Sequence, residues 1–181
     1  MRRLMLLRHA KTEGTTPSGE DSDRRLVPRG FADAHLIGRW MAEHDAVADL
    51  VLVSNAVRAR QTWEAVAPLL AAHVPNAEVA YLDDLYLADP IDILRIIHGA
   101  ADDDPARLLV VGHNPGLHEL ALGLTAEADE SLRRALSHNL PTSALAVIDF
   151  AVDDWRDVSF RRGRLAAFVT PKLLSQSMQD N

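Results

Sequence analysis

The sequence has no cysteine among its 181 residues. This absence excludes disulfide bonds, metal sites built from thiolates, and catalysis by a thiol. It is compatible with a reducing compartment, and we expect a cytoplasmic protein.

Long apolar runs and dense basic blocks are also missing. The first apolar run is cut by Arg8 after four residues, too early for the core of a signal peptide. No run reaches the length of a transmembrane helix. The densest basic stretch, residues 161–164, is typical of a turn between strands, and the formal net charge is −7. We therefore expect neither a nucleic-acid partner nor a membrane partner.

Two common motifs of phosphate and metal chemistry are absent as well. The chain contains no G-x-x-x-x-G-K-[ST] sequence, which excludes a Walker loop, and no H-E-x-x-H sequence, which excludes that zinc motif. His113 and His118 are five residues apart, a poor spacing for two metal ligands on one helix face. We expect no metal and no cofactor.

Three short apolar segments are typical of strands buried on both faces of a parallel sheet. They lie within residues 4–10, 49–54 and 108–112. Further strands are predicted at residues 77–82, 143–150 and 164–169. Helices are predicted at residues 28–44, from a cap at Ser54 or Asn55 to about 70, and at 89–98, 114–123 and 125–137. Strands that alternate with helices favour an α/β fold, a three-layer α/β/α sandwich with helices on both faces of a mostly parallel sheet.

The length and the 48% hydrophobic content fit one globular domain. We assign residues 1–174 to this domain and residues 175–181 to a polar tail that we expect to be frayed. The polar segment 11–25 is interpreted either as a mobile wall over a pocket or as a solvated connection.

Each of the three buried strands is followed by groups that carry, or can carry, positive charge. Arg8 and His9 end the first strand, Arg58 and Arg60 follow the second within two helical turns, and His113 follows the third. Open α/β sheets bind ligands at the carboxyl ends of their strands. Such a cluster repels itself unless an anion fills it, and one pair of unit charges about 4 Å apart contributes roughly 4 kcal/mol at an effective dielectric near 20. We interpret the site as a phosphate pocket.

Histidine is the nucleophile that remains for this pocket. A thiolate is excluded, and the first strand ends in Arg8 and His9 rather than in the carboxylates that an aspartate-nucleophile phosphatase needs. An imidazole can attack phosphorus in line and hold it as a phosphoramidate, while arginines neutralise the equatorial oxygens. His9 must then be neutral, and nearby arginines lower its pKa. His113 would serve best protonated, as a donor, but the same arginines oppose its protonation.

Three ordered blocks resemble the signature of the histidine phosphatase superfamily, also called the phosphoglycerate-mutase-like family. They are Leu-Leu-Arg-His-Ala-Lys at 6–11, Ser-Asn-Ala-Val-Arg-Ala-Arg-Gln-Thr at 54–62, and Val-Gly-His-Asn-Pro at 111–115. Residues 23–30 resemble the linker of the small SixA-type branch, whose known members dephosphorylate phosphohistidine on proteins. The resemblance implies a largely parallel six-stranded sheet flanked by helices. It also implies that His9 accepts the phosphoryl group and that Arg8, Arg58 and His113 bind its oxygens.

The chain departs from the family pattern at the general acid. Larger phosphatases and mutases of the family carry a glutamate after the third strand, whereas the matching stretch, 85–87, is Leu-Tyr-Leu. Asp84 and Asp89 are the nearby substitutes. Transfer from an alcohol needs the proton of this acid, but a P–N bond to imidazole breaks with far less help. The departure favours a phosphohistidine or otherwise activated substrate and argues against mutase activity.

Three functions follow from these patterns. The first is a metal-independent phosphatase that acts on phosphohistidine in a protein, such as a histidine-containing phosphotransfer domain. The second is a phosphatase of small phosphate esters with Asp84 or Asp89 as acid. The third, a phosphate-binding module without turnover, is least favoured because a binder needs no nucleophile. Lys11 and Thr12, just past His9, either contact the phosphate or face water.

Overall fold

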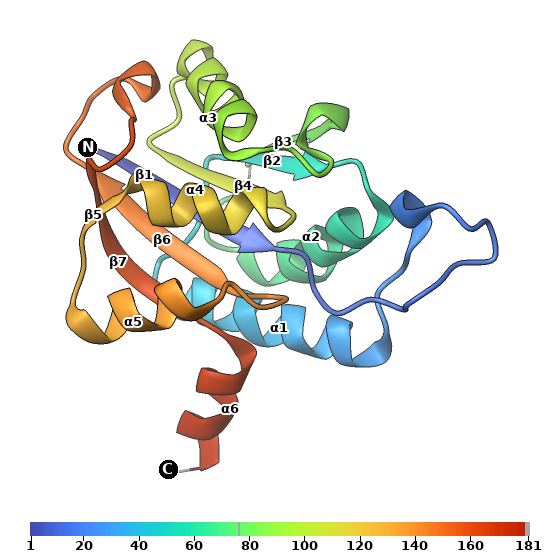
Figure 1. Cartoon of the computed structure of the whole chain (residues 1–181). Helices are drawn as coiled ribbons and strands as arrows, with labels where there is room; N and C mark the ends of the chain where they lie inside the picture. Colours follow the sequence, from blue (N-terminus) through green and yellow to red (C-terminus); the bar gives the residue numbers. More distant parts are fainter. Residues whose placement is uncertain (76, 180–181) are drawn as a thin grey trace.

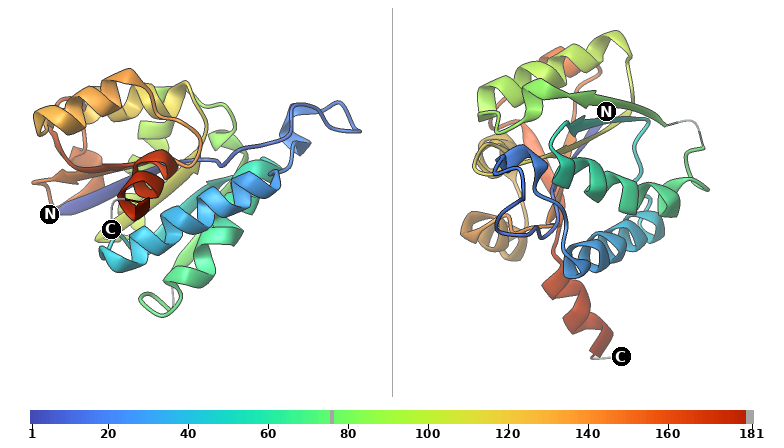
Figure 2. Two further views of the ribbon diagram at one scale, coloured as in Figure 1. Left: turned by 90° about the horizontal axis from the view of Figure 1, so that it is seen from below. Right: turned by 90° about the vertical axis from the view of Figure 1, so that its right-hand side faces the viewer.

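A computed structural model describes residues 1–75 and 77–179, which form a sheet of seven strands between two layers of helices (Figure 1, Figure 2). The strands are β1 (Arg2–Arg8), β2 (Leu50–Ser54), β3 (Glu78–Leu82), β4 (Arg107–Gly112), β5 (Thr125–Glu127), β6 (Leu145–Phe150) and β7 (Gly163–Val169). The α-helices are α1 (Pro28–Glu43), α2 (Val57–Leu70), α3 (Pro90–Gly99), α4 (Gly116–Leu124), α5 (Glu130–His138) and α6 (Pro171–Gln179). The predicted α/β class is confirmed.

The strand order in the sheet is β3-β2-β4-β1-β6-β7-β5. The first four strands in this order are parallel neighbours, β6 is antiparallel to both β1 and β7, and β5 is parallel to β7. The prediction of six strands is wrong by one. Residues 125–127, predicted as the start of a helix, instead extend beside β7, where Thr125 is in register with Gly163. The helix α5 therefore begins only at Glu130.

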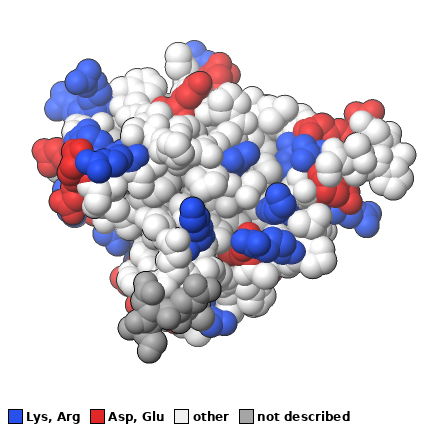
Figure 3. Space-filling model, turned by 60° about the horizontal axis from the view of Figure 1, so that its bottom comes forward, with Lys and Arg blue, Asp and Glu red and all other residues white. Residues whose placement is uncertain are grey.

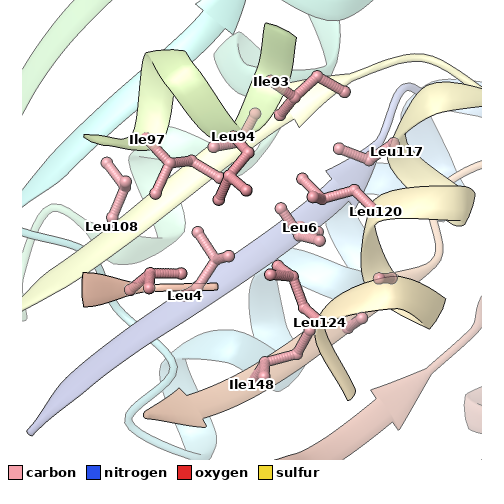
Figure 4. Close-up of a cluster of buried hydrophobic side chains, with 14 of the residues drawn as sticks. Leu4, Leu6, Ile93, Leu94, Ile97, Leu108, Leu117, Leu120, Leu124 and Ile148 are labelled. Carbon is pink, nitrogen blue, oxygen red and sulfur yellow. The ribbon is translucent and has the colours of Figure 1, made fainter. Parts of the chain in front are cut away.

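Strand β1 runs through the centre of the molecule with side chains buried on both sheet faces. Leu4 and Leu6 point into a cluster with side chains of α3 and α4 (Figure 4). Met5 and Leu7 point into a second cluster, formed with α1 and α2. All four are fully buried, and burying each contributes about 1.5–3 kcal/mol. Because side chains alternate along a strand, only an uninterrupted apolar run satisfies both faces, as the sequence predicts.

The register of the central strands sets where the chain leaves the sheet. Arg8 in β1 is opposite Gly112 in β4, and Val111 in β4 is opposite Val53 in β2. Because the three strands are parallel, the residues that follow them emerge at the same edge of the sheet. His9, His113 and Ser54 meet there.

The predicted cap of α3 is confirmed. The Asp89 carboxylate accepts hydrogen bonds from the backbone N–H groups of Ile91 and Asp92, both at 3.0 Å, and Pro90 is the first helical residue. This pairing satisfies donors that the first helical turn leaves free.

The predicted caps of α2 and α4 are wrong, because their polar side chains bond elsewhere. Ala56 precedes α2, while the Ser54 hydroxyl contacts His113 and the Asn55 amide donates to Asp83. Pro115 precedes α4, and the Asn114 amide donates to the Leu140 carbonyl at 2.8 Å.

The final helix, α6, extends into the polar tail, so the prediction of a frayed end is wrong for residues 175–179. The Thr170 hydroxyl accepts a hydrogen bond from the backbone N–H of Leu173 at 3.2 Å, and Leu174 packs against the cluster beneath α1 and α2. Residues 180–181 lie outside the described residues. No helix in the described part of the chain has the length and apolar character needed to span a membrane.

Replacing Gly116 tests the close approach of α4 to the segment before α3. A Cβ atom there would lie 1.9 Å from the Ala88 carbonyl oxygen. We expect Gly116→Ala to lower the free energy of unfolding by about 1–3 kcal/mol, measured by urea denaturation. Gly99→Ala is the control, because a Cβ at Gly99 meets nothing within 4 Å, and it should leave stability unchanged or raise it by about 0.4–1 kcal/mol. Equal stability of the two variants would contradict the packing described here.

Candidate active site

A cavity of about 400 Å³ lies at the carboxyl ends of β1 and β4. We name it the cup and define it by its lining residues, which are Arg8, His9, Lys11, Thr12, Asp21, Arg24, Arg58, Leu87, His113, Asn114 and Thr142. Arg8, His9, Arg58 and His113, which come from three separate sequence blocks, are therefore brought together. Lys11 and Thr12 line the cup as well.

The other residues singled out in the sequence lie outside the cup. The Arg60 guanidinium lies over the ring of Tyr81, with its carbon 4.7 Å from the ring centroid. Asp89 caps α3, and Asp84 is exposed in the 3₁₀ turn Asp83–Leu85. Neither Asp84 nor Asp89 is among the residues that line the cup, so the geometry of the cup gives no support to either carboxylate as the acid.

One of the two ring nitrogens of His9, Nε2, has a lone pair that is available for reaction. The Nδ1 of His9 lies 2.8 Å from the Ala10 carbonyl oxygen, which can only accept, so Nδ1 carries the hydrogen and Nε2 keeps its lone pair. Burial, and then the positive charges of Arg58, Arg8 and Arg24, lower the pKa of His9 to about 4. His9 is therefore neutral at neutral pH, the state that a nucleophile requires.

His113 faces His9 across the cup, with their ring centroids 5.2 Å apart. It is 2% exposed, and its Nε2 lies 2.7 Å from the Ser54 hydroxyl. Burial, and then the neighbouring His9 and Arg58, lower the pKa of His113 to about 3. An imidazolium at this position is thus unavailable near neutral pH when the cup holds no anion.

Arg8 and Arg58 are both oriented by hydrogen bonds to the protein. Arg58, only 3% exposed, donates from Nη1 to the Asp21 carbonyl at 2.7 Å and from Nη2 to the Asp21 carboxylate at 2.9 Å. Arg8 donates from Nη1 to the Leu140 carbonyl at 3.0 Å. Burial, and then the charge of Arg58, lower the pKa of Arg8, which indicates that the two cations are not fully compensated.

Buried polar atoms without a partner gather at the cup. Among the described residues, four of the six such side-chain atoms belong to its lining: Arg8 Nε, Arg58 Nε, His113 Nδ1 and Asn114 Oδ1. Buried polar groups in folded proteins are normally paired. The two guanidinium nitrogens can only donate, so the cup is suited to a ligand that carries acceptor oxygens.

Asp21 and Arg24 complete the lining and were missed in the sequence. The Asp21 carboxylate accepts hydrogen bonds from the Tyr86 hydroxyl at 2.7 Å, from Arg24 at 2.9 Å and from Arg58. These bonds, that of Tyr86 foremost, hold the pKa of Asp21 well below its usual range. Of the two interpretations of segment 11–25, a wall over the pocket agrees with the four residues of the segment that line the cup, and the mobility of this wall stays a prediction. The only signal for the wall was the linker-like run at 23–30.

Figure 3 shows how charged side chains are distributed over one face of the molecule. On the face shown in Figure 3, Lys and Arg side chains are scattered among Asp and Glu side chains, and no block of one sign covers it. Within residues 1–75 and 77–179, no group of three or more His, Cys, Asp or Glu side chains is placed to hold a metal ion.

The chain is similar to known proteins in sequence and in fold. Residues 4–85 match the model of the histidine phosphatase superfamily (branch 1). An uncharacterized protein of Mycobacterium leprae is 34% identical over 170 residues, which are 92% of this chain and 100% of that protein.

Two solved structures are also similar. One, from Agrobacterium tumefaciens and assigned as the phosphohistidine phosphatase SixA, is 32% identical, with a TM-score of 0.76 over 94% of this chain and 98% of that one. Another with the same assignment, from Nakamurella multipartitia, is 29% identical, with a TM-score of 0.78 over 94% and 96% of the two chains.

The two lowered histidine pKa values predict how stability depends on pH. In the unfolded chain a histidine has a pKa near 6.5. Below that pH the unfolded state therefore binds protons at positions 9 and 113, whereas folded His9 and His113 stay neutral because their pKa values are lower. The free energy of unfolding should fall as the pH drops from 6.5 toward 4, by up to about 1.4 kcal/mol per pH unit for each histidine. Urea denaturation between pH 7 and pH 4.5 measures this slope.

The variant His113→Gln should remove about half of that slope. The exposed His73, replaced in His73→Gln, is the matched control and should leave the slope as it is in the wild type. An unchanged slope in His113→Gln would show that His113 is protonated freely in the folded protein.

Proposed function

We propose, from the premise that this chain belongs to the histidine phosphatase superfamily and is a phosphohydrolase, that its substrate is phosphohistidine carried by a protein. The observation that carries the proposal is the lack of a usable acid. Among the described residues that line the cup, Asp21 is the one carboxylate, and its hydrogen bonds to Tyr86, Arg24 and Arg58 keep it ionised.

An ionised Asp21 has no proton to give to a leaving alkoxide. Hydrolysis of a phosphate ester therefore lacks the assistance that general-acid catalysis provides, typically a factor of 10²–10⁴. Imidazole is a better leaving group than alkoxide, and its second ring nitrogen takes a proton from water. The composition of the cup thus favours a P–N bond over a P–O bond.

The residues of the cup have defined roles in this proposal. Nε2 of His9 attacks phosphorus in line, a P–N bond to His9 forms, and the P–N bond of the substrate breaks to release its histidine. Water then attacks the phosphorus, and the P–N bond to His9 breaks, which releases inorganic phosphate and restores neutral His9. Arg8, Arg58 and His113 bind the phosphoryl oxygens and stabilise their charge in both steps.

The rim of the cup supports a protein as the carrier. Leu87, which lines the cup, is 52% exposed and has a φ of 49°, a left-handed conformation that a leucine rarely adopts. Strained backbone is retained mainly where function requires it. An exposed apolar side chain at this place suits contact with the surface around a phosphohistidine better than contact with a small polar ester.

The substrate preference can be measured directly. We expect kcat/KM for a phosphohistidine-containing phosphotransfer domain to exceed that for phosphoserine peptides and sugar phosphates by at least 10²-fold, because the esters lack an acid. Asp84→Asn and Asp89→Asn are matched controls, since asparagine also caps a helix, and both should retain full activity. Equal activity on esters, together with a loss in either variant, would favour the phosphatase of small esters.

The covalent intermediate is the second test. Rapid quenching with labelled phosphohistidine protein should trap a labelled enzyme whose phosphate survives alkali but not acid, as expected for a phosphoramidate. His9→Ala should hold no label, while His118→Gln should hold it, because His118 lies outside the cup. Turnover should persist in EDTA, since arginines supply the positive charge, and stop with vanadate. Label in His9→Ala would disprove the assigned nucleophile.

A further inference from the structure

We propose that Ser54 sets the tautomer of His113, so that a neutral imidazole presents an N–H group at Nδ1 to the phosphoryl oxygens. Ser54 is a positioning residue, because it acts through His113 and does not line the cup. The assignment of the tautomer stands on hydrogen bonding alone. Its catalytic consequence rests on the proposed function.

The hydrogen bonds of Ser54 determine which atom donates. Ser54 is fully buried at the end of β2, and its Oγ accepts from the backbone N–H of Ala56 at 3.4 Å. The hydroxyl hydrogen still needs an acceptor. Among the described residues, Nε2 of His113, at 2.7 Å, is the acceptor that the Ser54 hydroxyl reaches. The hydroxyl therefore donates to Nε2, and in a neutral imidazole the hydrogen must then be on Nδ1.

The opposite tautomer leaves two buried groups unpaired. If Nε2 carried the hydrogen, the Ser54 hydroxyl would have no acceptor, and Nδ1 of His113 would hold a buried lone pair without a donor. That lone pair would also repel a phosphoryl oxygen bound in the cup. With the hydrogen on Nδ1, a phosphoryl oxygen completes the pairing instead.

The two histidines of the cup thus use the same tautomer for opposite purposes. The Ala10 carbonyl holds the hydrogen of His9 on Nδ1, which leaves the lone pair of Nε2 free to attack. The Ser54 hydroxyl occupies the lone pair of His113, which leaves an N–H free to donate. This arrangement removes the conflict found in the sequence, because His113 can donate without becoming protonated among the arginines.

The fold holds the His113 ring in this orientation. The parallel pairing of β2 with β4 places Ser54 beside the residues that follow Gly112. The ring of Tyr86 packs edge-on against His113, with centroids 5.6 Å apart, and His9 packs on it at 5.2 Å. A ring rotation that exchanged its two nitrogens would lose the bond to Ser54.

Nitrogen NMR tests the tautomer without reference to activity. In protein labelled with ¹⁵N-histidine at pH 7, the His113 resonances are identified by their loss in His113→Gln. We expect Nδ1 to be protonated and Nε2 unprotonated. In Ser54→Ala the protonated nitrogen should become Nε2 in a measurable fraction of molecules, whereas Ser54→Thr, which keeps a hydroxyl, should retain the wild-type pattern. A wild-type His113 protonated at Nε2, or an unchanged pattern in Ser54→Ala, would overturn the proposal.

A double-mutant cycle tests the catalytic consequence. Ser54→Ala should lower kcat with phosphohistidine protein at least tenfold and weaken inhibition by inorganic phosphate, but it should have no further effect in a His113→Gln background. The matched control is Ser143→Ala, which truncates another fully buried serine and should keep both the activity and the tautomer. A further loss in the double variant would indicate a structural role for Ser54 and overturn the proposal. If the wild type fails to hydrolyse phosphohistidine, the proposed function fails, while the NMR result still decides the tautomer.

Discussion

The adjacency of three parallel strands, β1, β2 and β4, is the constraint on which the rest of the structure depends. Their shared direction delivers Arg8 and His9, Ser54, and His113 to one edge of the sheet. The apolar clusters on both faces of β1 hold the register, since a shift by one residue would turn Leu4 and Leu6 toward the opposite cluster. The chemistry of the cup is therefore placed by packing in the core.

Burial, and after it the nearby positive charge, explains why the pKa of each of the two histidines is lowered. The guanidinium groups of Arg8 and Arg58 lie beside imidazoles that have little contact with water, so the added positive charge of protonation is disfavoured. Neutral histidines can serve as a nucleophile and as a donor only if their tautomers are set by neighbours. Ala10 and Ser54 supply those neighbours at 2.8 and 2.7 Å. In the proposed function a phosphoryl group completes the site, because its oxygens accept from the donors that the protein leaves unpaired.

The segment 11–25 is tied to the cup through α2. The Thr62 hydroxyl accepts from the backbone N–H of Ala10 and donates to the Arg58 carbonyl, and the Gln61 side chain accepts from the backbone N–H of Leu26. The second sequence block thus holds both ends of the segment that forms the wall. Asp21 in that wall orients Arg58 and is itself restrained by Tyr86, so the Arg58 guanidinium is held in place by the protein alone.

The α/β class, the buried central strands and the convergence of the three sequence blocks on one site could be predicted from the chain alone, because they follow from local patterns. An uninterrupted apolar run needs two covered faces, and residues that follow parallel strands share one edge. The predictions of helix caps were wrong where a polar side chain has a distant partner. Ser54 bonds to His113, Asn55 to Asp83, and Asn114 to the Leu140 carbonyl. Asp21, 37 residues from Arg58, entered the cup for the same reason. These pairings, and the position of Asp84 and Asp89 outside the lining of the cup, were visible only in the folded chain. Hydrogen bonds between distant segments leave no periodic trace in a sequence.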